Sequence, residues 1–494
     1  MPFTYKEIPA LALWEPIHRD DWGTAEARHF LERAGFASHP EAIEEVLDLG
    51  PAKTCERFFP RSEFVIPEWI DESIATSEKI ASDAKAAEDK EERNRLYREK
   101  RQHDQEAVLL LEHEWLLRAA MPETGFRAKW ELFLSDVWVV GKRTVRYPKW
   151  LTSYWQSLAS LSDVPYPKFC KLFSREPAMV RYLDLNRNSK SKPNENFARE
   201  LFELFTLGEG NYTEADIKEA ARAFTGRRLY GNRYLEVKKH FDGGRKTVFE
   251  QTGNWDGDQI IDLIFEKPAA RVFLPNEAIR FYLTHEELDP RRLAVLGGLW
   301  AEEDFRLDAL RRRLFSSRAF YALDFRGNRI KSPVELYIGS LQRFGLQPIP
   351  MPRYSTRHLR AMGQELFEPP NVRGWIGGEA WINAGKLAAR RQAIAELFQD
   401  FSEKSLNADD QYRIDRERGR QDHLSFRVDI DRLVERIGPT NNDFIQFVND
   451  QILINPPGPT FFRRVRDHLG NKAHPAEVRE VLVTILQSPH YQLS

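Results

Sequence analysis

Apolar side chains recur every three to four residues along most of this 494-residue chain, which is the spacing of amphipathic helices. Segment 24–35 is an example, since it begins with a threonine cap and ends with glycine. One interval breaks the helical period: 227–251 holds two short extended runs on either side of Gly231 and Asn232, a favourable pair for a hairpin turn. The pattern predicts an all-α protein with a small β-hairpin insertion.

The segment 71–119 is predicted to be one long helix. Its first half consists almost entirely of charged residues and alanine, whereas 107–121 is amphipathic. Because apolar residues at heptad spacing are sparse in the first half, we expect a solvated, protruding helix rather than a partner-binding coiled-coil arm. The second half should enter the core.

The chain length corresponds to roughly three average domains, or to one large helical body with insertions. We predict an N-terminal helical region over 1–122 that contains the long charged helix. A central helical core over 123–395 carries the hairpin insertion and the candidate site, and 396–494 forms a C-terminal helical region. One continuous domain remains the alternative.

Composition excludes several classes of protein. The 73 Lys and Arg residues and 75 Asp and Glu residues give a net charge of −2, so there is no cationic excess for nucleic acid. No run of about twenty apolar residues occurs, and we expect no membrane insertion. The first residues lack a basic start followed by a long apolar run, so we expect a cytoplasmic protein. The two cysteines, Cys55 and Cys170, are expected to be buried thiols.

The first candidate site follows Pro193, which suits the start of a helix. Asn194 and Glu195 come next and can serve the exposed amides of the first turn. At 100° per residue, four further side chains share one polar stripe: Asn196, Arg199, Glu200 and Glu203. We predict that Glu195 or Glu200 is a general acid or base, because a buried carboxyl beside a second one can hold a raised pKa. An ordinary surface pair between Arg199 and Glu203 is the alternative.

A capping box at 213–216 begins a second helix, on which Glu219 and Arg222 lie off the apolar face. Two short helices joined by a glycine-containing turn tend to pack antiparallel, which would bring Glu219 and Arg222 near Glu200. A cluster of carboxylates and guanidinium groups is typical of a functional site, and equally of a structural ion-pair network. Both interpretations stay open.

The loop 368–383 contains two prolines and three glycines, so its backbone can approach a ligand closely. Trp375 and Trp381 either stack on a sugar ring or anchor the loop. Three polar residues flank them and are predicted to bind substrate: Asn371, Arg373 and Asn383.

Motifs for metals and nucleotides are missing from the sequence. There is no HExxH, GxxxxGK[ST], GxGxxG or GxSxG, and the twelve histidines do not cluster. Asn254, Asp256 and Asp258 alternate as in a calcium loop, but Phe265 stands where a bidentate glutamate is required. We expect neither a metal site nor a cofactor.

The chain resembles bacterial proteins of the domain-of-unknown-function family 1800 over nearly its whole length. The most specific blocks are Asn-Glu-Asn at 194–196 and Pro-Pro-Asn-Val at 369–372, and further blocks include 27–36 and 488–493. The resemblance carries no known reaction. Relatives place two histidines in the helix that corresponds to 129–140, where this chain has Ser135 and Val137. Any metal binding or proton transfer by those histidines is therefore lost or replaced here.

Two hypotheses on function follow. In the first, the chain is a carboxylate-based acid/base enzyme that acts on a polar, hydroxyl-rich substrate such as a glycan, which Arg199, Arg222 and Arg373 orient. In the second, it is a non-catalytic scaffold or partner, because the resemblance implies genes beside those of sulfatase-like proteins of unknown-function family 1501. A compact open pocket containing Glu200 and Trp375 would favour the enzyme. Burial of the charged segment 82–105 against another chain would favour the scaffold.

The absence of the paired histidines leads to a prediction about metal content. The purified protein should carry no stoichiometric zinc or iron, because Ser135 and Val137 cannot replace imidazole ligands. Elemental analysis of the protein measures this directly. One tightly bound transition metal per chain would contradict the prediction and would favour a carboxylate site around Glu200 and Glu203.

Overall fold

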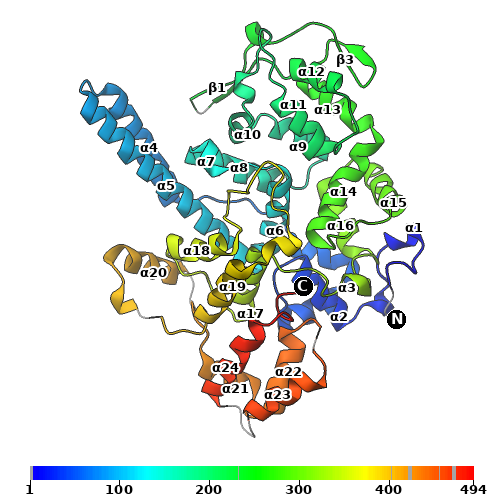
Figure 1. Cartoon of the computed structure of the whole chain (residues 1–494), viewed down its shortest axis with the longest axis vertical. Coiled ribbons are helices and arrows are strands. Elements are labelled where there is room, and N and C mark those ends of the chain that lie inside the picture. Colours follow the sequence, from blue (N-terminus) through cyan, green and yellow to red (C-terminus); the bar gives the residue numbers. More distant parts are fainter. Residues whose placement is uncertain (1–3, 232, 402, 421–424, 456, 470–473) are drawn as a thin grey trace.

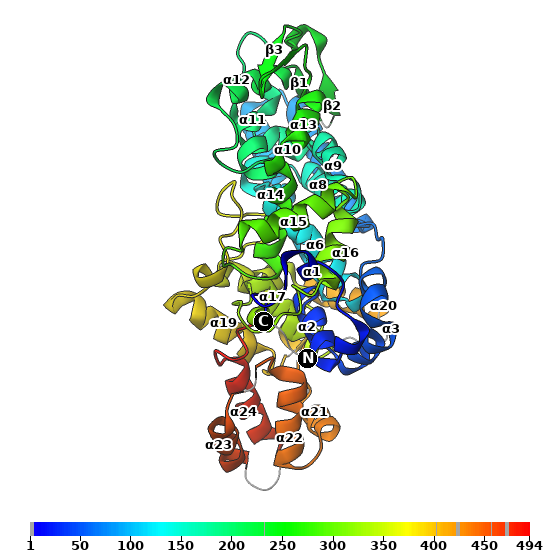
Figure 2. The same ribbon diagram turned by 90° about the vertical axis from the view of Figure 1, so that its right-hand side faces the viewer.

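The computed structural model describes residues 4–231, 233–401, 403–420, 425–455, 457–469 and 474–494. This part of the chain is mainly helical, with two small antiparallel sheets of two strands each. The prediction of an all-α protein with a small β-hairpin insertion is therefore confirmed. The molecule is elongated, with the strands at one end, α21–α24 at the other and the candidate site between them (Figures 1 and 2).

The N-terminal helices pack around α6 (Pro122–Val137), which is buried on nearly every side. A helix of this kind lies in the core of a large protein. Besides α6, this part contains α1 (Ala10–Leu13), α2 (Thr24–Arg33), α3 (Pro40–Phe58) and α8 (Pro148–Leu161).

The predicted long helix over 71–119 is in fact two antiparallel helices, α4 (Glu68–Ala86) and α5 (Lys90–Ala120). The pair projects from the body (Figure 1), as expected for the charged segment. The turn was missed because its only signal is Asp89, whose carboxylate caps α5 by accepting the N–H of Glu92 at 2.7 Å. An apolar contact also joins the two helices, since Ile70 and Ile74 of α4 pack against Ala107 of α5.

The central region supplies most of the remaining helices. They are α7 (Lys142–Val145), α9 (Tyr166–Phe173), α10 (Pro177–Tyr182), α11 (Asn196–Glu200), α12 (Glu214–Ala223), α13 (Gly257–Glu266), α14 (Pro268–Tyr282), α15 (Pro290–Ala301), α16 (Leu307–Ser316), α17 (Pro333–Arg343), α18 (Pro352–Met362) and α19 (Ala384–Glu396). The C-terminal helices are α20 (Ala408–Arg420), α21 (Ile430–Ile437), α22 (Asn441–Phe447), α23 (Pro459–Leu469) and α24 (Pro475–Leu486). Among the described helices, none is both long enough and apolar enough to cross a membrane.

The predicted hairpin is formed by β1 (Arg227–Tyr230) and β2 (Arg233–Glu236). Of its two turn residues, Gly231 has a φ of 57°, and Asn232 lies outside the described residues.

A second hairpin, β3 (Lys246–Val248) and β4 (Gln251–Gly253), was not predicted. Its turn residues Phe249 and Glu250 both have positive φ, at 51° and 66°. Such residues give no turn signal in a sequence. The turn is held from outside, because the N–H of Phe249 donates to Asp216 at 2.7 Å.

One connected apolar core runs through the body, and both cysteines are buried thiols, as predicted. Charged side chains are also buried in its centre. The guanidinium of Arg33 is fully buried and donates to the carbonyls of Tyr282, Leu283, Phe325 and Ser494. A single side chain thereby joins α2 to the end of α14 and to the last residues of the chain.

Replacing Arg33 should be among the most damaging substitutions in the chain. Arg33→Met removes the donors of several buried carbonyls at once, so we expect the free energy of unfolding to fall by about 3–5 kcal/mol. Chemical denaturation followed by circular dichroism measures the change. Arg291→Met is the matched control, because the Arg291 side chain is 92% exposed and should change stability by less than about 0.5 kcal/mol. Equal stability of the two variants would contradict the role given to Arg33.

Candidate functional site

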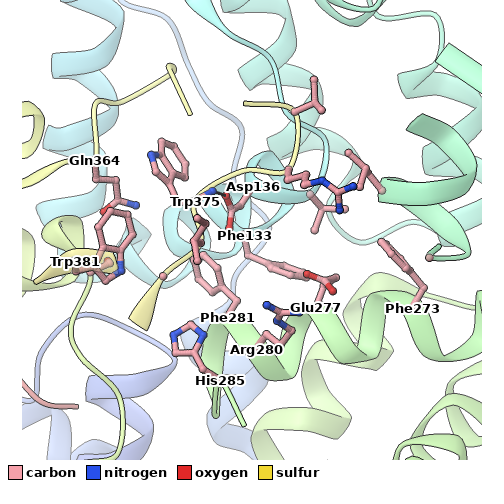
Figure 3. Close-up of a pocket in the computed structure, with 18 of the residues that line it drawn as sticks. Phe133, Asp136, Phe273, Glu277, Arg280, Phe281, His285, Gln364, Trp375 and Trp381 are labelled. Atoms are coloured by element: carbon pink, nitrogen blue, oxygen red, sulfur yellow. Dashed lines mark hydrogen bonds between the residues drawn. The ribbon is translucent and has the colours of Figure 1, made fainter. Parts of the chain in front are cut away.

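A cavity of about 480 Å³ lies where α6 and α14 meet the loop that was predicted to approach a ligand (Figure 3). Aromatic side chains form much of its wall: Phe133, Phe273, Phe281, Trp375 and Trp381. Charged and polar side chains form the rest, among them Asp136, Glu203, Glu209, Glu277, Arg280, His285, Arg329, Glu335, Gln364 and Arg373. About half of the lining residues are charged or polar, and polar groups that converge on one cavity are the groups that orient a ligand.

Asp136 stands at the end of α6, in the middle of this cavity (Figure 3). One of its carboxyl oxygens accepts the N–H of Trp375 at 2.8 Å. Burial, and to a lesser extent the charge of Glu277, raises the pKa of Asp136 to about 7, against the lowering effects of the Trp375 N–H and of Arg280. Near neutral pH this carboxyl can therefore both hold and release a proton.

Glu277 projects into the cavity from α14, beside Arg280 (Figure 3). Burial raises the pKa of the Glu277 carboxyl, and the nearby Arg280 guanidinium opposes this effect. Both residues share one helix face with Phe273 and Phe281, because the spacing is three to four residues. Sequence analysis missed this carboxyl, although a charged pair set between phenylalanines at helical spacing was a usable signal.

Two glycines let the loop lie directly on the polar wall. A side chain at Gly374, whose φ is 77°, would come within 2.6 Å of the Asp136 main-chain oxygen and closer still to its carboxyl group. One at Gly377, with a φ of 76°, would lie 2.6 Å from the His285 ring. At these two glycines the loop backbone therefore lies against Asp136 and His285.

The predicted loop residues divide into two groups. Arg373, Trp375 and Trp381 line the cavity, and Arg373 pairs with Glu209 at 2.5 Å. The indole N–H of Trp375 is buried and has no hydrogen-bond partner among the described residues.

Asn371 and Asn383 serve the backbone. Asn371 accepts the N–H of Arg373 at 2.8 Å, and Asn383 caps α19 by accepting the N–H of Lys386 at 2.8 Å. Neither of them is among the residues that line the cavity.

The predicted catalytic carboxyls lie beside the cavity rather than on its wall. Glu195 pairs with Arg199 at 3.3 Å, and Arg199 is held more closely by Glu214, at 2.8 Å. Glu200 is half-buried, and its pKa is raised by burial and by the charge of Glu203. Of these carboxylates only Glu203 contributes to the cavity wall.

A π-helical turn, η3 (Leu201–Thr206), explains why the polar stripe does not continue as predicted. The wider turn changes the angle between successive side chains after Glu200, so the 100° period no longer applies. The turn is stabilised by Thr206, whose hydroxyl donates to the Leu201 carbonyl, and by Tyr166, whose hydroxyl donates to the Phe205 carbonyl at 2.6 Å. The consequence is that Glu203 and the next residue, Leu204, line the cavity.

The remaining predicted residues stabilise neighbouring backbone. The side-chain amide of Asn196 donates to the Leu183 carbonyl at 3.2 Å, and that of Asn194 to the Asp184 carbonyl at 3.4 Å.

Glu219 and Arg222 do not pair with Glu200. Arg222 binds Asp242 at 2.8 Å and Glu219 at 2.7 Å, while Glu219 also accepts the N–H of Thr247 at 3.2 Å. These contacts tie α12 to β3, so this pair belongs to the structural network that was the alternative interpretation.

Ser135 and Val137, the two positions at which the resemblance implies histidines, flank Asp136. Val137 lines the cavity, and the hydroxyl of Ser135 donates to the Leu132 carbonyl within α6. In the part of the chain that the structure describes, no group of three or more His, Cys, Asp or Glu residues is arranged to hold a metal ion.

Comparison with known proteins gives one match. The family model described as "Protein of unknown function (DUF1800)" matches residues 29–493. No curated protein matches the chain. No solved structure matches it either.

The contact between the loop and Asp136 can be tested at Gly374. Gly345→Ala serves as the control, since Gly345 has a similar φ of 65° but open space around it. That substitution should cost only the backbone strain of about 1–2 kcal/mol. Gly374→Ala should cost about 1–3 kcal/mol more, because the new methyl group overlaps Asp136. Thermal and chemical denaturation measure both values, and equal losses would show that the loop does not press on Asp136.

Proposed function

We propose that this chain, which belongs to the protein family of unknown function DUF1800, is an enzyme that uses carboxyl groups for acid/base catalysis. The substrate would be polar and rich in hydroxyl groups, such as a glycan. Asp136 and Glu277 take the roles that sequence analysis assigned to Glu195 and Glu200, since the latter two are not on the cavity wall.

The proposal depends on one observation: two carboxyls with raised pKa face the same aromatic-walled cavity. A carboxyl in water is ionised at neutral pH and cannot act as an acid there. Raising its pKa toward the working pH makes proton transfer efficient, and this arrangement is common in active sites. The same shift can arise in a structural network, but among the described residues neither Asp136 nor Glu277 forms an ion pair that would account for its burial.

The two carboxyls would divide the work. Asp136, with a pKa of about 7, would donate a proton to the leaving oxygen as the C–O bond breaks. Glu277, which Arg280 favours in the ionised form, would accept a proton from the attacking water. The N–H of Trp375 holds the Asp136 carboxyl in place, and the rings of Trp375 and Trp381 would cover the faces of a sugar.

The catalytic proposal is tested by removing each carboxyl. We screen the protein against nitrophenyl glycosides and polysaccharides for release of phenol or reducing ends. Asp136→Asn and Glu277→Gln should each lower turnover by about 100-fold or more, as is typical when a general acid or base is lost. Glu302→Gln, an exposed carboxyl beyond the end of α15, should leave turnover unchanged.

Glu200→Gln separates the two sets of carboxyls. If the cavity pair acts, Glu200→Gln keeps most of the activity and its stability holds or rises, since a half-buried carboxyl next to Glu203 is removed. Turnover that survives Asp136→Asn but not Glu200→Gln would return the role to Glu200. No binding or turnover with any member of the panel would leave the scaffold hypothesis, with a partner of family 1501.

The Asp136→Asn variant also tests the raised pKa of Asp136, through the pH dependence of stability. Asp136 has an ordinary pKa of 3.8, raised to about 7 in the folded chain, so folding takes up a proton between these values. This contribution to stability is complete below about pH 4 and is lost as pH rises through about 7. The stability of Asp136→Asn relative to the parent should therefore rise between pH 5 and pH 8, by about 1–2 kcal/mol after allowance for solvent screening. A pH-independent difference in unfolding free energy would contradict it.

A further inference from the structure

The guanidinium of Arg329 is a buried cation without a full set of partners. Arg329 is only 5% exposed and lines the cavity. Two of its nitrogens, Nε and one terminal nitrogen, are buried and have no hydrogen-bond partner among the described residues. Its one ion pair, with Glu335, is long at 3.6 Å. Buried donors are nearly always satisfied in native proteins, so the unsatisfied nitrogens of a guanidinium at a cavity wall are open to a water or a ligand in the cavity.

The neighbouring charges do not neutralise Arg329. Glu335 is the only carboxylate paired with it among the described residues, and Glu335 also binds Lys129 at 2.9 Å. The other oxygen of Glu335 accepts the N–H of Ser332 at 2.7 Å. Two buried cations therefore share one anion. This side of the cavity keeps an excess of positive charge.

Further hydrogen-bond donors line the cavity. Arg280 and His285 lie together along one edge in Figure 3, and Gln364 and Trp381 lie across from them. Arg329, Arg280 and His285 line the same cavity. Burial, followed by the charges of Arg329 and Arg280, lowers the pKa of His285 to about 4. The imidazole is therefore neutral at physiological pH and can offer one N–H without adding charge.

The carboxylates of the cavity do not occupy the place where an anion would meet Arg329. Glu203 and Glu209 belong to the end where Arg373 lies, and Glu209 is already paired with it. Asp136 and Glu277 lie on α6 and α14, and neither forms an ion pair with Arg329 among the described residues. An anionic group placed at Arg329 would meet donors on several sides and one shared carboxylate.

We propose that the cavity holds an oxyanion-binding subsite formed by Arg329, Arg280 and His285. A planar, permanently charged guanidinium suits a carboxylate or a sulfate or phosphate ester, which share the oxygens that bind it. On the proposed function, which this extension depends on, the substrate is an acidic glycan that carries one of these groups next to the bond that reacts. The subsite itself does not depend on catalysis, because it can be measured by binding alone.

Binding of simple anions tests the subsite. Isothermal titration of the full-length protein at constant ionic strength compares four probes: glucuronate, inorganic sulfate, inorganic phosphate and neutral glucose. Glucuronate should bind at least tenfold more tightly than glucose. A preference for sulfate or phosphate over glucuronate would identify an ester, and the reverse order would identify a carboxylate. Equal binding of all four probes overturns the proposal.

Variants assign the effect to Arg329. Arg329→Met should weaken binding of the preferred anion at least tenfold. Arg390→Met is the control, because Arg390 is also fully buried but is not among the residues that line the cavity, so anion affinity should be retained. Unchanged anion binding by folded Arg329→Met overturns the proposal.

A second variant decides the case if Arg329→Met does not fold. Arg280 is exposed, so Arg280→Gln should fold normally, and anion binding should weaken at least threefold. Unchanged affinity overturns the subsite. If the parent protein binds no anion but turns over neutral glycans in an Asp136-dependent way, only the subsite and the acidic substrate are refuted. Anion binding without any turnover would refute only the catalytic role.

Discussion

The burial of charge at the centre of the molecule is the constraint on which the rest of the structure depends. Lys129 of α6 donates to the carbonyls of Arg33 and Gly35 and pairs with Glu335 of α17. Removing such charges from water costs several kcal/mol each, and only a fixed arrangement of acceptors offsets the cost. This requirement fixes the relative positions of α2, α6 and α17. These helices support one side of the cavity, so a region that is expensive to bury also gives the site a rigid wall.

The fold was largely predictable, because it depends on local periodicity. The helical period, glycine stops and the first hairpin turn are properties of neighbouring residues. The failures came where distant contacts decide. The turn of β3 and β4 uses Phe249 and Glu250 in a conformation that is held from α12 by Asp216. The break between α4 and α5 has only the Asp89 cap as a local signal.

The site was predictable in part for the same reason. The loop with Arg373, Trp375 and Trp381 was found because prolines, glycines and tryptophans in one short stretch are distinctive. Glu200 lies beside the cavity and Glu203 on its wall; this could not be predicted, because the π-helical turn Leu201–Thr206 changes the helical period and no single residue indicates it. Asp136 and Glu277 come from helices far apart in the chain, and only packing brings them to one cavity.

The projecting α4–α5 pair has a mechanical consequence. α5 has 31 residues, which at 1.5 Å per residue makes a continuous rod of about 46 Å. Its outer half stands in solvent, while Glu112 in its inner half pairs with Lys142, which also binds Glu365 at the start of the cavity loop. The helix contains neither proline nor glycine, which are the usual causes of a sharp kink. One unbroken helix therefore connects the exposed end of the pair, through Glu112 and Lys142, to the residues just before the cavity loop.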